Sequence, residues 1–157
     1  MGRIVSRSSL KTPVAMFIFN RRDVTARVFA EVRRAQPKQL FLISDGARSD
    51  RPGEERQVSL TREIVTGIDW ECDVKTLFRE NNLGCKMAVS GAIDWFFENE
   101  GMGIILEDDC LPSQSFFWFC EELLEMYNYD MRIGQISGDN FQKGIKRGEG
   151  DYYFSIY

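Results

Sequence analysis

Short apolar runs recur along this chain, separated by polar turns and by segments with apolar residues at helical spacing. Continuous apolar runs are typical of strands that are buried on both faces, as in parallel sheets. The runs after Pro13 and before Ser44 have this character, whereas the run at 74–78 is less apolar and is expected nearer an edge. Strands are therefore predicted at 14–19, 40–43, 74–78, 103–106, 132–136 and 151–157.

The segments between these runs predict helices, because their apolar residues recur at intervals of three and four. The third helix turns either Phe96 or Phe97 inward, and Ser113 is the expected N-cap of the fourth. The predicted helices cover about 21–34 and 54–66, and two more begin after 84 and at 113. This alternation predicts an α/β fold, with a mostly parallel sheet flanked by helices.

Composition narrows the possible chemistry. The 157 residues suit one domain, and a net charge of -4 without a basic block argues against binding to nucleic acid. No apolar run approaches the roughly 20 residues that span a bilayer, and the first residues lack a hydrophobic signal-peptide core. The chain has no histidine, which excludes Ser-His-Asp and Cys-His catalysis. Its four cysteines form no Cys-x-x-Cys pair, which indicates reduced thiols in the cytoplasm rather than a zinc site.

Polar residues directly follow several of the predicted strands. Arg21 lies just past the first strand, Asp45 follows the second, Glu107–Asp109 the fourth and Asp139 the fifth. The carboxyl ends of parallel strands meet at one edge of a sheet, and ligands bind there. We therefore expect these side chains to frame one site, with the acidic triplet at the end of a central strand.

The acidic triplet is the most informative of these motifs, since adjacent carboxylates repel one another. Hard cations such as Mg²⁺ and Mn²⁺ favour carboxylate oxygens, and often take one or two protein carboxylates together with substrate phosphates. Glu107, Asp108 and Asp109 therefore indicate a metal-assisted site for a phosphate-bearing ligand. The alternative is a solvated turn whose acids lie favourably near a helix N-terminus.

Each of the other candidates also has a purely structural alternative. Arg21 and Arg22 could clamp a phosphate through paired hydrogen bonds, or could be exposed residues of a first helical turn. Asp45 could accept hydrogen bonds from a base or a ribose, although Ser-Asp-Gly is also an ordinary turn. Lys86 could reach an anion, although it also fits an ordinary helix start. Asp139 could line the same edge or belong to an Asp-Asn turn.

Together these motifs resemble the GT-A glycosyltransferases, from about Pro13 to Asn140. Within that fold the chain is most similar to the N-acetylglucosaminyltransferases with a Glu-Asp-Asp form of the DxD motif, and it also resembles bacterial nucleotide-diphospho-sugar transferases. The strongest likeness is Ile-Ile-Leu-Glu-Asp-Asp-Cys-Leu-Pro, which leads into a helix that opens with paired phenylalanines. Pro-Val-Ala-Met-Phe-Ile-Phe-Asn-Arg and Leu-Ile-Ser-Asp-Gly resemble the family's first two strands.

The resemblance implies a Rossmann-like domain that binds a nucleotide-diphospho-sugar, with a UDP-sugar favoured. The domain would transfer a hexosyl or N-acetylhexosaminyl group to an unknown saccharide or glycoconjugate acceptor. It implies that Asp109 binds Mn²⁺ or Mg²⁺. Asp108 and Glu107 would bind ribose or sugar hydroxyls, and Arg21 and Asp45 would hold the nucleotide. With Lys86 included, the predicted donor-binding residues are Arg21, Asp45, Lys86, Glu107 and Asp108.

The chain also departs from the family. No residue before Tyr157 matches the family's acceptor base convincingly, and Asp139 is a candidate that the family itself does not use. The ending at 151–157 resembles a strand cut from its continuation, so this chain alone could be inactive. We predict a flexible segment at 1–12 and a C-terminally incomplete donor-binding domain at 13–157, in the cytoplasm or at the inner-membrane surface. The alternatives are a non-catalytic nucleotide- or sugar-binding module and an unrelated α/β domain with solvated acids.

Overall fold

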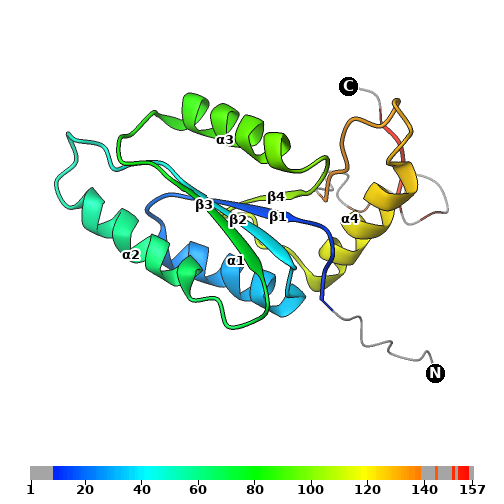
Figure 1. The fold of residues 1–157 in the computed structure, drawn as a ribbon, viewed down its shortest axis with the longest axis horizontal. Helices are drawn as coiled ribbons and strands as arrows, with labels where there is room; N and C mark the ends of the chain where they lie inside the picture. The colour runs from blue at the N-terminus through cyan, green and yellow to red at the C-terminus, as the bar shows by residue number, and fades with distance from the viewer. Residues whose placement is uncertain (1–8, 139–143, 145–149, 151, 156–157) are drawn as a thin grey trace.

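A computed structural model describes residues 9–138, 144, 150 and 152–155. These residues form an alternating series of strands and helices, with the sheet lying between the helices (Figure 1). The elements are β1 (Val14–Ile18), α1 (Arg22–Ala35), β2 (Gln39–Ser44), α2 (Glu54–Thr66), β3 (Asp73–Phe78), α3 (Cys85–Asn99), β4 (Ile104–Glu107) and α4 (Gln114–Tyr127). The predicted α/β class is confirmed, and the arrangement is consistent with a Rossmann-like fold.

The sheet is parallel throughout, in the order β3-β2-β1-β4. Its registers pair Ile18 with Ser44, Ser44 with Phe78, and Phe17 with Glu107. The carboxyl ends of the strands therefore lie at one edge, as predicted. β3 is an edge strand, as its sequence indicates. β4 forms the other edge of the described sheet, so the predicted central position of the acidic triplet is wrong.

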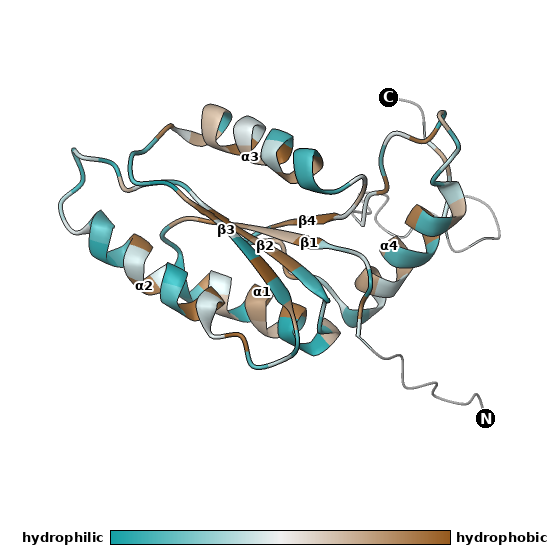
Figure 2. Cartoon of the chain, in the orientation of Figure 1, coloured by the Kyte–Doolittle hydropathy of each residue, from teal (hydrophilic) through white to brown (hydrophobic). Residues whose placement is uncertain are grey.

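One face of the sheet is covered by α1, α2 and α4. Alternate β1 residues Met16 and Ile18 point to this face and join its core cluster. The same cluster contains Val28 of α1, Val65 of α2 and Phe117 of α4. Figure 2 shows hydrophobic stretches along the sheet and a mixture of hydrophilic and hydrophobic residues along the helices. Among the helices that the structure describes, none has the length and apolar character needed to cross a membrane.

The opposite face of the sheet is covered by α3 (Figure 1). Phe96 is fully buried there, and its ring packs edge-on against Phe41 of β2 at 4.9 Å between centroids. Phe97 is 49% exposed, so the structure identifies Phe96 as the inward residue of the two. Gly103 permits this packing, because a Cβ at that position would lie 2.3 Å from the Phe96 ring.

The predicted fifth strand at 132–136 is wrong, since these residues form the end of a turn and then irregular chain. Asp130 explains the turn. Its carboxylate accepts hydrogen bonds from the backbone and the guanidinium of Arg132, and its carbonyl accepts one from the Ile133 N–H at 2.9 Å. These local bonds hold the chain in a turn immediately after α4.

The predicted sixth strand at 151–157 is also not found where the structure describes it. Residues 152–155 are irregular, and the other residues of this prediction lie outside the described ranges. Tyr152 and Phe154 pack on Tyr127 of α4, with ring centroids 6.4 and 5.7 Å away. Aromatic packing on a helix thus replaces the expected strand pairing.

Residues 10–12 join the packed domain, although the predicted flexible segment extends to residue 12. Leu10 is fully buried. The backbone N–H groups of Lys11 and Thr12 donate to the Glu121 carboxylate at 2.7 and 3.0 Å. These bonds attach the chain before β1 to the middle of α4.

Replacing Phe96 by alanine is expected to lower the free energy of unfolding by about 3–5 kcal/mol, because a large cavity is left beneath α3. Phe97→Ala is the matched control, since it removes the same side chain from a half-exposed position on the same helix. Urea denaturation of both variants measures the difference. Equal losses of stability would contradict the assignment of Phe96 as the inward residue.

Candidate functional site

Arg21 and the two aspartates of the acidic triplet meet at the carboxyl edge of the sheet. Arg21 is the N-cap of α1, and its carbonyl accepts a hydrogen bond from the Thr25 N–H at 3.0 Å. Asp108 and Asp109 lie in the turn after β4, which closes with a 3.2 Å bond from the Cys110 N–H to the Glu107 carbonyl. Because β1 and β4 are neighbours, the Arg21 side chain reaches both aspartates.

The guanidinium of Arg21 spans the two carboxylates. Its Nη1 donates to Asp109 Oδ2 at 2.7 Å, its Nη2 donates to Asp108 Oδ1, and its Nε lies 3.4 Å from Asp108 Oδ2. Thr25 Oγ1 also lies 3.4 Å from Asp108 Oδ2. A planar fork of N–H donors is suited to this arrangement, in which a single guanidinium serves two carboxylates.

The two aspartates differ in their surroundings. Asp108 is buried, at 3% exposure, whereas the Asp109 side chain is 44% exposed and the Arg21 side chain 48% exposed. The hydrogen bond from Arg21 lowers the pKa of Asp109, and those to Asp108 and Asp109 raise the pKa of Arg21. Asp109 and Arg21 are therefore both charged at neutral pH in this arrangement.

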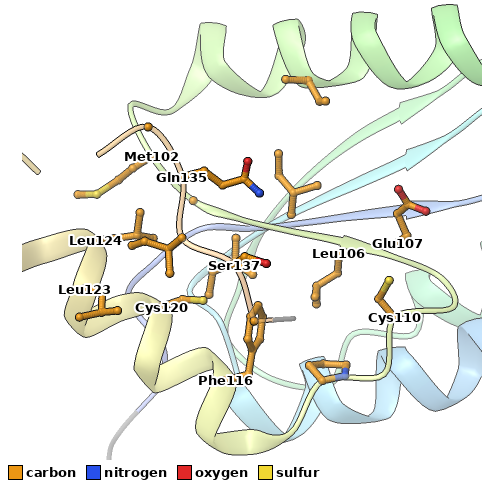
Figure 3. A pocket seen from close by; sticks show the side chains of 18 of the residues that line it. Met102, Leu106, Glu107, Cys110, Phe116, Cys120, Leu123, Leu124, Gln135 and Ser137 are labelled. Atoms are coloured by element: carbon orange, nitrogen blue, oxygen red, sulfur yellow. The ribbon is translucent and has the colours of Figure 1, made fainter. Parts of the chain in front are cut away.

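Glu107, the third acid, is exposed and borders a cleft of about 1060 Å³. Asp109 also borders this cleft, which lies between β4, α4 and the segment 133–138. Figure 3 shows Glu107 at one end of the cleft and Leu124 towards the other. The cleft thus combines a carboxylate end with walls of mixed polar and apolar residues.

Asp45 lies on the same edge of the sheet, and its carboxylate holds two loops together. It accepts hydrogen bonds from the backbone N–H groups of Gly46, Leu83 and Gly84, at 3.0 to 3.1 Å. Asn82 adds a 2.7 Å bond from its side-chain amide to the Gly46 carbonyl. The loop after β2 is thereby attached to the turn that opens α3. Within the described part of the chain, the Asp45 carboxylate and the aspartates of the acidic triplet have different hydrogen-bond partners.

Arg62 of α2 supports the same pair of loops. The sequence pattern did not predict this role. Its guanidinium donates to Ser44 Oγ at 3.0 Å, to the Asp45 carbonyl at 2.9 Å and to the Arg79 carbonyl at 2.7 Å. It therefore ties the carboxyl ends of β2 and β3 to one helix. An arginine within a predicted helix carries no local signal for this role, because the partners are brought together by the fold.

A second group that the sequence did not indicate surrounds Glu54, the first residue of α2. Its side chain is 6% exposed and forms an ion pair with Arg48. It also accepts hydrogen bonds from the Arg48 N–H at 2.8 Å and from the Asn20 amide at 2.9 Å. Glu54 therefore anchors the loop after β2 to the end of β1. The only local signal was its place after Pro52-Gly53, at a predicted helix start.

Lys86 and Asp139 are the other two candidates that the sequence suggested. Lys86 is exposed in the first turn of α3, after the turn that Asp45 holds. Asp139 lies outside the described residues. The sheet therefore brings Arg21, Asp108 and Asp109 into direct contact, and it places Asp45 on the same edge with different partners.

The carboxylates beside Arg21 can be compared with the ligands that a divalent cation requires. Among the described residues, no three His, Cys, Asp or Glu side chains are grouped so as to hold a metal ion. A Mg²⁺ or Mn²⁺ ion that is shared with substrate phosphates needs only one or two protein carboxylates. Asp109 fits this requirement, because it offers hard oxygen atoms at the surface and already accepts a hydrogen bond from a cation, the Arg21 guanidinium.

Comparisons with protein family models, with curated proteins and with solved structures found no match to this chain. Function must therefore be inferred from the motifs and from the geometry at the carboxyl edge. That geometry offers an arginine fork, an exposed carboxylate and a buried carboxylate within one contact network.

Gly46→Ala is expected to destabilise the fold by about 1–3 kcal/mol, because there is no room for a side chain between the two loops. A Cβ at this position would lie 2.4 Å from the Asn81 carbonyl carbon and 2.5 Å from the Glu80 oxygen, both backbone atoms. Gly101→Ala is the control, since a Cβ there meets nothing within 4 Å. Thermal denaturation compares the two, and equal midpoints would contradict close packing of the loops.

Glu54 is expected to make stability depend on pH in the acid range. Hydrogen bonds from Arg48 lower the pKa of Glu54 from 4.5 to about 2. A lowered pKa stabilises the folded state above the ordinary value, so this contribution is present at neutral pH and is lost as the pH falls from 4.5 towards 2.

The measurement is the free energy of unfolding between neutral and acid pH, for wild type and Glu54→Gln. The variant is expected to be less stable at neutral pH and to lose less stability on acidification. Glu55→Gln removes an exposed charge from the same helical turn and serves as control. A Glu54→Gln curve parallel to wild type would show that the Arg48 contact does not carry the effect.

Proposed function

We propose that this chain is a glycosyltransferase domain that binds a nucleotide-diphospho-sugar with a divalent cation and transfers the sugar to an acceptor. The observation that carries the proposal is the contact of Arg21 with Asp108 and Asp109 at the carboxyl edge of a parallel sheet. This edge is where α/β sheets bind ligands, and it joins a phosphate-binding side chain to a cation-binding one. The sequence likeness to the GT-A family supports the same reading.

Asp109 is the proposed ligand of Mn²⁺ or Mg²⁺. It is the exposed member of the Arg21 network, so a cation can reach it from solvent without opening the core. When bound, the cation would stabilise the negative charge that develops on the leaving diphosphate. Arg21 would add its own positive charge at the same phosphates.

The remaining residues have distinct proposed roles at the donor. Glu107 is exposed at the border of the cleft and can accept hydrogen bonds from sugar hydroxyls. Asp108 was expected to bind ribose or sugar hydroxyls, but it is buried and engaged by Arg21 and Thr25, so its proposed role is to orient Arg21. Asp45 holds the loop that would face the nucleotide, and Lys86 stands at the start of α3. A UDP-sugar with a hexosyl or N-acetylhexosaminyl group is the favoured donor.

A non-catalytic nucleotide- or sugar-binding module is the second candidate. It is favoured by one observation, namely that Asp108 and Asp109 both form ion pairs with Arg21. A site whose acids are already paired with an arginine can hold a ligand without performing proton transfer. Binding and turnover must therefore be measured separately.

The test of donor binding is a thermal-shift series with UDP-, GDP-, dTDP- and CMP-sugars, each with and without Mn²⁺. At a ligand concentration of about 100 times Kd, a bound donor stabilises the fold by about 2.7 kcal/mol, which raises the midpoint by several degrees. Asp109→Ala is expected to abolish the part of this rise that depends on Mn²⁺. Asp94→Ala, which removes an exposed acid from α3, should retain the full rise.

The two candidate functions give different results in the same series. A glycosyltransferase should also release nucleoside diphosphate from the stabilising donor, by hydrolysis or by transfer to an added saccharide. Stabilisation without any release would favour the binding module. If no nucleotide stabilises the wild-type chain in Mn²⁺, donor binding is refuted for both candidates.

A further inference from the structure

Arg21 already occupies one oxygen of Asp109, the carboxylate proposed to bind a divalent cation. Its Nη1 donates to Asp109 Oδ2 at 2.7 Å, and the side chains on both sides of this bond are about half exposed. The guanidinium and a metal ion at the same carboxylate would repel each other, and both require its oxygen atoms. Arg21 therefore competes with the cation for Asp109.

We infer that Arg21 exchanges partners during donor binding: the divalent cation displaces it from Asp109, and the released guanidinium binds the donor diphosphate. This inference rests on the proposed function, because it concerns the regulation of that site. It goes beyond the assignment of separate roles to Arg21 and Asp109, since it makes each ligand depend on the other.

The contacts of Arg21 allow a partial release. Asp108 accepts hydrogen bonds from Nη2 and Nε, is only 3% exposed and is further engaged by Thr25. A buried carboxylate that loses its cation is strongly destabilised, so the bonds to Asp108 should persist. The bond from Nη1 to Asp109 is the exposed one and can be given up. The guanidinium then stays anchored at Asp108 and presents Nη1 to a phosphate.

This exchange predicts positive coupling between the metal ion and the diphosphate. A cation alone must break the Arg21–Asp109 pair, which weakens its binding. A diphosphate offers Arg21 a new partner and leaves Asp109 available, so the cation binds more tightly when the diphosphate is present. By linkage the diphosphate gains by the same factor, typically about 5- to 150-fold for such coupling.

The decisive measurement is the affinity of Mn²⁺ alone, read from the electron paramagnetic resonance signal of the free aquo ion. Arg21→Gln is expected to bind Mn²⁺ roughly tenfold more tightly than wild type, because the competitor is absent. Arg22→Gln is the matched control, since it removes the same charge from the next, exposed position and leaves the Arg21 contacts in place. It should change Mn²⁺ affinity much less.

A second arm measures UDP binding by calorimetry, with and without saturating Mn²⁺. Wild type is expected to bind UDP more tightly in Mn²⁺, whereas Arg21→Gln should bind UDP more weakly and lose most of this difference. Opposite shifts for Mn²⁺ and UDP in one variant are the signature of partner exchange. A residue that served only to support the fold would weaken both ligands.

Unchanged or weaker Mn²⁺ binding by Arg21→Gln would overturn the inference. Arg21→Lys controls for misfolding, because it retains the positive charge but lacks the planar guanidinium with its several N–H donors. It should bind Mn²⁺ with intermediate affinity, and wild-type affinity in a folded Arg21→Lys variant would also overturn the inference. The Mn²⁺ arm needs no nucleotide. If the nucleotide-sugar still stabilises the wild type but Mn²⁺ and UDP do not strengthen each other's binding, only the exchange is refuted. If the wild type binds neither Mn²⁺ nor UDP, the proposed function is refuted as well.

Discussion

The parallel pairing of β1 with β4 is the contact on which the candidate site depends. It sets Phe17 opposite Glu107, so that both chains leave the sheet at the same level. Arg21 then begins α1 beside the turn that carries Asp108 and Asp109, although 87 residues separate Arg21 from Asp108 along the chain. A shift of this register would separate the guanidinium from the carboxylates and leave Asp108 as an uncompensated charge.

Burial and the geometry of the candidate site are therefore linked at Asp108. A carboxylate with 3% exposure requires hydrogen bonds and an opposite charge, and Arg21 and Thr25 supply them. The same contact holds the arginine at the edge where an anionic ligand would arrive. The ion pair with buried Asp108 thus holds the Arg21 guanidinium in place, while the Arg21 side chain stays about half exposed to solvent, where a ligand can contact it.

The sequence predicts β1 to β4 and this edge well, because both follow from short-range rules. Continuous apolar runs mark β1 and β2, and parallel topology then brings Arg21, Asp45 and Asp108 to one edge. It fails at 132–136, where hydrogen bonds that Arg132 donates to the Asp130 carboxylate hold the chain in a turn. It also cannot reveal the partners of Glu54, since Asn20 lies 34 residues away and its side-chain contact arises only when β1 and α2 are in place.

The two aspartates at this edge are held by different kinds of partner. Asp45 is held by backbone N–H groups of Gly46, Leu83 and Gly84, which belong to the folded loops and cannot move aside without opening them. Asp109 is held by the tip of one long side chain that is half exposed. A ligand can replace a side-chain partner far more readily than a set of backbone donors. Between Asp45 and Asp109, the latter is therefore the carboxylate that is suited to exchange a resident cation for an incoming one.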